Sequence, residues 1–332
     1  MSMDYNDLIK MCAVNGISGN EGQIRSLILS MIENHIDDYS VDALGNLIAH
    51  KKGPGKKIML AGHMDQIGLI VTYISKEGFV YFSTIGGLRP AYCLGQRFSF
   101  PGGAVGVVAC ERLDDPKDLS FEKMYLDIGA KDGEDARQQV KIGDVCVYAA
   151  GPVISGGVLV SPALDDRVGC YVMVEALKRV KTPVFDMYFV FTSQEEVGLR
   201  GARTSAFAIE PDYGLAFDVT ISSDTPKARK FPSKMYGGAA IKIKDSSLLC
   251  HPLIIKHLED CAAQAGVRYQ YEILEAGGTD SGAIHLTKGG VPSGVISVAT
   301  RYIHSANEMC ALSDIEDSIS LTVKALETEI TP

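Results

Sequence analysis

The periodicity of the apolar residues changes twice along this chain, and those two changes constrain the fold more than any other feature. Residues 4–36 carry apolar residues at helical spacing, and the apolar run Ile58–Ala61 that follows predicts a buried strand. From residue 159 onward, helical stretches such as 168–180 alternate again with apolar strands such as 187–191. Strands that alternate with helices predict a mixed or parallel sheet covered by helices on both faces.

The stretch between these two parts has a different pattern. Residues 68–158 contain short β-type apolar runs separated by Gly, Pro and Asp, and helical stripes are few. Such a pattern predicts a small β barrel or sandwich. The simplest architecture is therefore an α/β domain with a mixed sheet, built from residues 1–67 and 159–332, with a β-rich domain of residues 68–158 inserted into it.

Composition and charge narrow the range of functions. The 332 residues carry a formal net charge of -9. This charge disfavours binding to nucleic acid or to an anionic membrane, because both require clustered Lys and Arg. No apolar run in the sequence approaches the roughly 20 residues that span a bilayer, and the acidic N-terminus lacks the features of a signal peptide. We therefore expect a cytoplasmic protein that acts on small molecules or peptides.

The eight cysteines are scattered along the chain and form no CxxC pair. This spacing argues against a zinc ribbon and against a thioredoxin-like site. We expect reduced, mostly buried thiols, as is usual for a cytoplasmic protein.

Polar residues that can bind metals follow several of the predicted strands. His63, with Asp65 two residues later, comes directly after the strand that ends at Ala61, and the pair Glu195-Glu196 follows the next buried strand. Ligand sites in α/β sheets cluster where strands end, so residues far apart in sequence have a reason to converge. The full set of candidates is His63, Asp65, Asp165, Asp166, Glu195, Glu196, Asp218 and His304.

Each candidate also has an ordinary structural interpretation. Asp165 and Asp166 precede an apolar helix and could simply cap it. Asp218 closes an apolar strand, where an acid can form a turn, and His304 could be a hydrogen-bonded structural residue. A single one of these signals is therefore weak evidence for a site.

Their joint occurrence is more specific. Two histidines and at least three carboxylates at successive strand ends suit Zn²⁺, Co²⁺ or Mn²⁺. The carboxylate of Asp65 is placed to orient the imidazole of His63 from behind. Neighbouring side chains on an extended backbone diverge, so one member of the Glu195-Glu196 pair can bind metal while the other faces substrate. A glutamate beside the ions supplies the general base that metal-assisted hydrolysis requires.

Six segments of the chain resemble the M42 family of metallo-aminopeptidases, which includes the tetrahedral aminopeptidases and glutamyl aminopeptidase. They lie in the expected order, span nearly the whole chain and together are highly specific. The organisation is also similar: a catalytic α/β domain of the zinc-peptidase type, interrupted by a β-rich dimerisation domain. The matching segments are AGHMDQIGLIV (61–71), SPALDDRVG (161–169), TSQEEVGLRGA (192–202), AFDVT (216–220), GGTDSGAI (277–284) and VPSGVISVATRYIHSANEM (291–309).

The resemblance implies a pair of divalent ions, Zn²⁺ or Co²⁺ with Mn²⁺ as an alternative, held by five ligands. Asp165 would bridge the two ions. Glu196 and His304 would bind one of them, and His63 and Asp218 the other.

The resemblance also implies roles for the neighbours of these ligands. Glu195 matches the general base that takes a proton from a water bridging the two ions, and Asp65 matches the carboxylate behind His63. Asp166 matches the residue that is often joined to the bridging aspartate by a cis peptide bond. The implied substrates are short peptides with a free N-terminus. The implied assembly is a homo-oligomer, either a dodecamer built from dimers or a dimer.

Two other functions compete with this interpretation. An endoglucanase-type glycoside hydrolase would use paired carboxylates, but it would need neither His63 nor His304. The chain also has no Trp and only 8% aromatic residues, whereas sugar sites usually rely on aromatic stacking. A non-enzymatic protein that keeps the fold is disfavoured by the complete ligand set together with Glu195.

Overall fold

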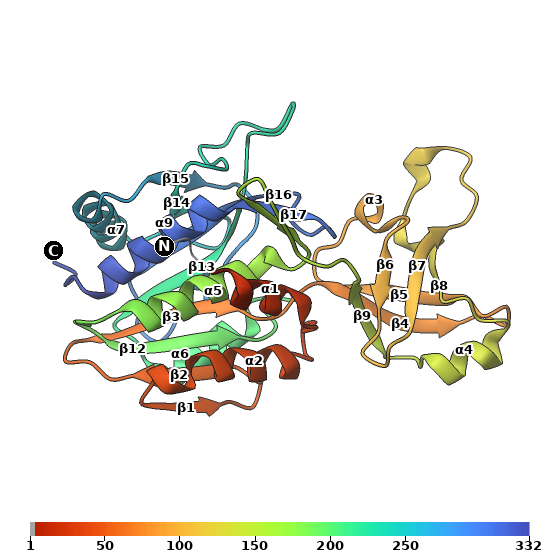
Figure 1. Ribbon diagram of the computed structural model, residues 1–332, viewed down its shortest axis with the longest axis horizontal. Coiled ribbons are helices and arrows are strands. Elements are labelled where there is room, and N and C mark those ends of the chain that lie inside the picture. Colours follow the sequence, from red (N-terminus) through yellow and green to blue (C-terminus); the bar gives the residue numbers. More distant parts are fainter. Residues whose placement is uncertain (1–3, 332) are drawn as a thin grey trace.

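Figure 1 shows a large α/β body beside a smaller β barrel, and the computed structural model describes residues 4–331 of the chain. Within those residues the body is built on a mixed sheet of eleven strands. Neighbouring strands at its centre are parallel, in the order β12 (Asp186–Thr192), β3 (Lys57–His63), β13 (Tyr213–Ile221) and β16 (Ser293–Arg301). The carboxyl ends of parallel strands meet at one edge of a sheet, so the residues at these ends are brought together.

The remaining strands of the sheet flank this parallel centre. On one side lie β2 and then β1, and on the other lie β17, β11 and β10 in that order, while β14 and β15 extend from β16. Their bounds are β1 (Asp38–Val41), β2 (Leu47–Lys51), β10 (Val153–Ser155), β11 (Val158–Ser161), β14 (Ala239–Lys244), β15 (Tyr269–Ile273) and β17 (Glu308–Ala311).

Helices cover both faces of the sheet. The side chains of β3 alternate between the two faces: Ile58 and Leu60 join one apolar core, whereas Met59 and Ala61 join the other. The first core contains residues of α1 (Asn6–Ala13), α2 (Gly22–Ile32), α5 (Leu164–Arg179), α7 (Pro252–Ala265) and α9 (Leu312–Leu326). The second contains residues of α6 (Arg200–Ile209) and α8 (Ser281–Ile284). The predicted α/β fold with a mixed sheet is confirmed.

The β-rich stretch folds as a closed barrel with an apolar core of its own. The strands follow the order β4-β5-β8-β7-β6-β9 around the barrel. After β9 the chain returns to the large sheet through β10 and β11. The bounds are β4 (Gly68–Ile74), β5 (Val80–Ile85), α3 (Pro90–Cys93), β6 (Arg97–Ser99), β7 (Val105–Cys110), β8 (Met124–Asp127), α4 (Gly133–Gln139) and β9 (Val145–Tyr148).

Two element boundaries differ from the sequence prediction. The apolar pattern predicts that a strand closes at Asp218, but β13 continues to Ile221 because β16 still pairs with it there. The helix predicted over 168–180 is assigned from Leu164. Its second and third residues have non-helical backbone angles, so the regular helix begins only after Asp166.

Within residues 4–331, no helix is both long enough and apolar enough to cross a bilayer. The eight cysteines are free, and all are buried except Cys110, which is partly exposed.

Candidate metal centre

The carboxyl ends of the parallel strands gather the predicted site residues at one edge of the sheet. His63 is the last residue of β3, and Glu195 and Glu196 follow β12. Asp218 lies within β13, beyond the last residue of that strand that pairs with β3. His304 comes three residues after the end of β16. The topology of the sheet therefore brings these strand ends to one edge.

Asp165, at the start of α5, lies between the two histidines. Its Oδ1 is 3.0 Å from Nε2 of His63, and its Oδ2 is 3.3 Å from Nε2 of His304. Oε2 of Glu196 is also 3.3 Å from Nε2 of His304. Ligand atoms of His63, Asp165 and Glu196 all lie within 4.8 Å of one another. One carboxylate between two imidazoles is the position that a bridging ligand needs.

Both histidines direct the same ring nitrogen toward these carboxylates. Nδ1 of His63 lies 3.1 Å from the backbone oxygen of Asp65, and Nδ1 of His304 lies 2.9 Å from the backbone oxygen of Gly87. A carbonyl oxygen can only accept, so each Nδ1 carries the proton. In the neutral form of each ring, Nε2 then has the lone pair that a cation can bind.

Two further predicted residues, Glu195 and Asp218, are not part of this group. Oε2 of Glu195 is 3.8 Å from Nε2 of His63, and the Glu195 side chain is 11% exposed. Asp218 is buried, and its Oδ1 accepts a hydrogen bond of 2.7 Å from the N–H of Val219. Among residues 4–331, the group of ligand atoms within 4.8 Å does not include Asp218. Burial and the charge of Asp165 nevertheless hold the pKa of Asp218 well above its usual range.

Crowded negative charge shifts the pKa of several groups here. Burial lowers the pKa of His304, but its contacts with Asp165 and Glu196 outweigh burial and raise it to about 12. Burial raises the pKa of Asp165, but the contacts from both histidines hold it below its usual range. Burial and the neighbouring carboxylates keep the pKa of Glu195 well above its usual range, against the opposing charge of His63.

The donor set fits divalent cations. Imidazole nitrogens and carboxylate oxygens are the ligands that Zn²⁺ and similar ions take in catalytic sites. Oε1 of Glu196 is buried and has no hydrogen-bond partner, although such atoms are rarely left unpaired in proteins. Buried carboxylates that outnumber the imidazoles also need a positive partner, because an unpaired buried charge is costly. A cation coordinated by Glu196 would meet both requirements.

Asp65 supports three site residues at once. Its backbone oxygen faces His63, as described above. Its Oδ1 accepts the N–H of Glu195 at 3.0 Å, and its Oδ2 accepts the N–H of Glu196 at 3.2 Å. The hydroxyl of Ser18 completes the set by donating to Oδ2 at 2.6 Å. Asp65 thus fixes the backbone of the Glu-Glu pair as well as the orientation of the imidazole.

Asp165 and Asp166 make different contacts. The peptide bond between them is cis, as the resemblance implies. Asp166 Oδ1 accepts the N–H of Gly169 at 2.9 Å, which is the helix-capping role that the sequence left open. Its Oδ2 accepts the N–H of His63 at 3.2 Å. Asp166 is therefore a cap and a support, whereas Asp165 contacts the imidazoles.

Three supporting residues were not predicted from the sequence. The spacing of Ser18 and Glu21 predicts a capping box, but α2 begins without a side-chain cap. Ser18 binds Asp65 instead, and Glu21 Oε1 accepts the N–H groups of Gly19 and Gln194. Glu308 accepts hydrogen bonds from the backbone of two predicted ligands. Its place in the segment IHSANEM is its only sequence signal.

Residues 45–321 match the M42 glutamyl aminopeptidase family. The chain belongs to this family. A putative aminopeptidase of Acetivibrio thermocellus is 50% identical, and the alignment covers 97% of this chain and 98% of that relative. The lysyl aminopeptidase of Pyrococcus furiosus is 32% identical over 99% of this chain and 98% of its own.

Solved structures of similar fold cover the chain almost completely. A TET aminopeptidase from a marine-sediment Thaumarchaeota archaeon is 34% identical, with a TM-score of 0.93 over 97% of this chain and 96% of its own. The Pyrococcus horikoshii TET1 peptidase is 30% identical, with a TM-score of 0.86 over 98% of this chain and 99% of the TET1 chain. That peptidase can assemble into a tetrahedron or a large octahedral shell. A Thermotoga maritima protein described as an endoglucanase is 30% identical, with a TM-score of 0.83 over 96% of each chain.

The barrel stretch of this M42 chain contributes directly to the site. Gly86 and Gly87 follow β5 and lie against the cluster. A Cβ at Gly86 would come within 3.3 Å of Oε2 of Glu196, and a Cβ at Gly87 would come within 2.9 Å of Cε1 and Nδ1 of His304. These glycines allow the backbone to approach closely enough for the Gly87 oxygen to accept from the imidazole.

Replacement of Gly87 by Ala should therefore weaken metal binding. The new methyl group would displace the His304 ring and its hydrogen bond to the backbone oxygen. We expect metal affinity to fall by roughly 10–100-fold, as is typical when the partner of a metal-binding histidine is lost. Isothermal titration of the metal-free protein with Zn²⁺ measures this change.

The matched control is Gly102→Ala in the same barrel stretch, where an added Cβ meets nothing within 4 Å. It should bind Zn²⁺ as the unmodified protein does. Unchanged affinity in the Gly87 variant would show that the barrel loop does not position His304.

Proposed function

We propose that this chain is a dinuclear metallo-aminopeptidase that hydrolyses the N-terminal peptide bond of short peptides. Membership of the M42 family supports the aminopeptidase class. The observation that carries the two-ion proposal is Asp165, whose two carboxylate oxygens lie 3.0 and 3.3 Å from the Nε2 atoms of two different imidazoles. A carboxylate in that position can bind a different cation through each of its oxygens.

The proposed ligands follow from these contacts and from the family resemblance. His63 and Asp218 would hold one ion, Glu196 and His304 the other, and Asp165 both. Zn²⁺ and Co²⁺ suit this set best, with Mn²⁺ as an alternative. When bound, such ions supply Lewis acidity, which polarises a carbonyl group and makes water nucleophilic near neutral pH.

Glu195 is the proposed general base. Its carboxylate lies at the margin of the cluster, and Asp65 accepts its backbone N–H at 3.0 Å, which holds the main chain from which the side chain extends. It would take a proton from the attacking water and return it to the nitrogen of the leaving amine. The water oxygen then forms the new bond to the carbonyl carbon as the C–N bond breaks, so atoms and protons balance.

A glycoside hydrolase is the second candidate, because one similar protein is described as an endoglucanase. The contacts of His63 and His304 with the site carboxylates argue against a glycoside hydrolase. Glycosidase chemistry needs two carboxyl groups facing each other across a sugar, one of them protonated. Here Asp165 and Glu196 both contact His304. Protein ligands that already face one another suit cations better than a glycosidic bond.

We further propose that the barrel is a dimerisation module, and that dimers assemble into a cytoplasmic dodecamer. The barrel exposes several large apolar side chains, which in a monomer would face water. The shell-forming TET1 peptidase is a relative of similar fold. The free thiols are consistent with a reducing compartment. The exposed apolar residues of the barrel are Tyr73, Leu94, Val105, Val107 and Ile142.

Metal removal should abolish peptidase activity reversibly. We expect a chelator to eliminate hydrolysis of aminoacyl-p-nitroanilides, because the carbonyl is no longer polarised. Zn²⁺ or Co²⁺ should restore it. A panel of acidic, basic and apolar aminoacyl groups, assayed beside a β-glucan, identifies the substrate class. Chelator-resistant cleavage of the glucan without cleavage of the anilides would favour the glycosidase.

Replacement of Glu195 by Gln should separate metal binding from turnover. The amide keeps the shape of the side chain but cannot accept a proton, so we expect kcat to fall by about 10²–10⁴-fold. The metal content should stay unchanged by elemental analysis. Glu134→Gln, on the exposed surface of α4, removes the same charge and should leave kcat intact. Near-normal turnover by the Glu195 variant would exclude it as the base.

The mass of the native particle tests the proposed dodecamer. We expect a particle of twelve times the chain mass of 35.7 kDa. The double variant Val105→Lys/Val107→Lys adds charge to adjacent outward positions on β7. It should shift the particle to smaller species while circular dichroism remains unchanged. A monomeric unmodified protein, or a double variant of normal mass, would contradict the barrel-mediated assembly.

A further inference from the structure

Glu308 occupies a special position in the large sheet. It is the first residue of β17, which lies between β16 and β11 and pairs antiparallel with both. Its register partner on β11 is Ser161, four residues before Asp165, and β16 leads to His304. Glu308 is therefore located between the two chain segments that deliver these two site residues.

Both oxygens of Glu308 are engaged by the main chain of those segments. Oε2 accepts the N–H of Asp165 at 2.9 Å, and Oε1 accepts the N–H of His304 at 2.8 Å. The residue is only 1% exposed. One rigid carboxylate thus connects the backbones of two residues that are far apart in sequence.

Burial of this carboxylate costs folding free energy. Among residues 4–331, no Lys or Arg forms an ion pair with Glu308. His304 also has a φ of 65°, a left-handed conformation that non-glycine residues rarely adopt. A buried carboxylate that holds a residue in this conformation needs a reason beyond packing.

We propose that Glu308 is a positioning residue of the metal centre, which sets the separation of Asp165 and His304 by binding both of their N–H groups. The proposal rests on the ligand roles assigned above to these two residues. A carboxylate is required because each of its oxygens accepts a hydrogen bond. The amide of Gln has a single oxygen, and its NH₂ group would face the second N–H, so one of the two connections would be lost.

The competing explanation is that Glu308 only stabilises the fold, and Asp314 provides a control for it. Asp314, near the start of α9, is also fully buried. Its two oxygens likewise accept two backbone N–H groups, from Tyr236 at 2.6 Å and from Gly238 at 3.0 Å. It touches none of the proposed ligands. Glu308→Gln and Asp314→Asn therefore remove the same kind of double acceptor, one beside the metal centre and one away from it.

The experiment compares these two variants with the unmodified protein and with His304→Ala. Each metal-free protein is titrated with Co²⁺ in competition with a chelator, and the visible absorption spectrum of bound Co²⁺ reports the ligand geometry. Thermal unfolding of the metal-free proteins measures stability separately. We expect Glu308→Gln to weaken Co²⁺ binding by roughly 10–100-fold and to change the spectrum. Asp314→Asn should lower the unfolding temperature but keep the affinity and the spectrum of the unmodified protein.

The outcomes are distinguishable. Co²⁺ binding by Glu308→Gln with normal affinity and spectrum would overturn the positioning role, as would an equal loss in Asp314→Asn. Failure of the unmodified protein to bind Co²⁺, or unchanged binding by His304→Ala, would instead overturn the ligand assignment. If Glu308→Gln does not fold, Glu308→Asp decides by the same measurements. It keeps both oxygens and the charge but is one methylene shorter, so it should also alter the spectrum.

Discussion

The cost of burying many carboxylates beside only two imidazoles is the constraint on which the rest of this structure depends. The parallel strands β12, β3, β13 and β16 create the crowding, because residues at their carboxyl ends share one edge of the sheet. An ion removes the cost only if its ligand atoms are already in place, since reorganising buried charged groups costs further free energy. The surrounding fold therefore has to hold the ligands before any ion arrives.

The fold holds them largely through their backbones. Three buried carboxylates, those of Asp65, Asp166 and Glu308, accept the main-chain N–H groups of site residues. Asp218 is the exception among the proposed ligands, because it lies in the interior of a strand, where the ladder of β13 with β16 fixes it. The other site residues lie at the ends of helices and strands or beyond them, and there side chains supply the constraint that neighbouring strands supply to Asp218. The residues held in this way are His63, Asp165, Glu195, Glu196 and His304.

The sequence predicts the strand-end residues well but their supports poorly, and the reason is physical. His63 and Glu196 follow apolar runs that are recognisable locally. The spacing of Ser18 and Glu21 equally suits a local capping box, and only the tertiary structure directs these side chains to Asp65 and Gln194. Glu308 reaches a partner 143 residues away, which depends on strand order rather than on local pattern. The end of β13 was mispredicted for the same reason, because pairing with β16 extends it.

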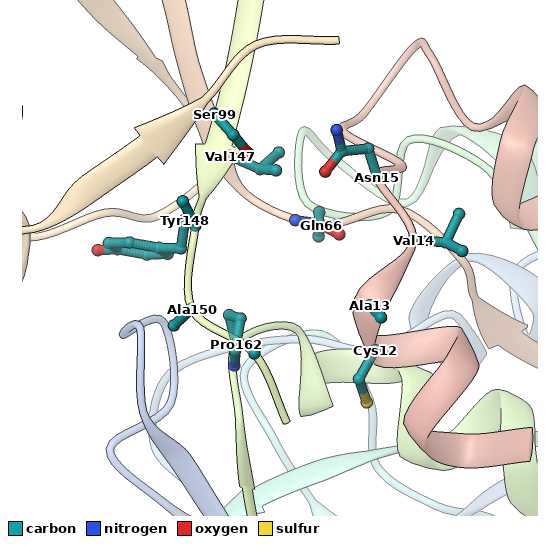
Figure 2. A pocket seen from close by; sticks show the side chains of 12 residues that line it. Cys12, Ala13, Val14, Asn15, Gln66, Ser99, Val147, Tyr148, Ala150 and Pro162 are labelled. Atoms are coloured by element: carbon teal, nitrogen blue, oxygen red, sulfur yellow. The ribbon is translucent and has the colours of Figure 1, made fainter. Parts of the chain in front are cut away.

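The barrel does more than extend the chain, because it supplies the group that orients the ring of His304, a proposed metal ligand. The oxygen of Gly87 accepts only from a protonated Nδ1, and this leaves Nε2 to face Asp165 and Glu196. The approach is close enough that the ring leaves no room for a Cβ at Gly87. Glu308 holds the backbone of the same histidine from the large sheet. His304 is therefore fixed from two sides by two bodies with separate apolar cores, so its geometry depends on how the barrel packs against the sheet. The hollow of about 300 Å³ in Figure 2, lined by Val14 and Gln66 of the body and by Ser99 and Tyr148 of the barrel, lies along that same junction. Because the Gly87 oxygen accepts from the His304 ring, a shift of the barrel at this junction would move that ring.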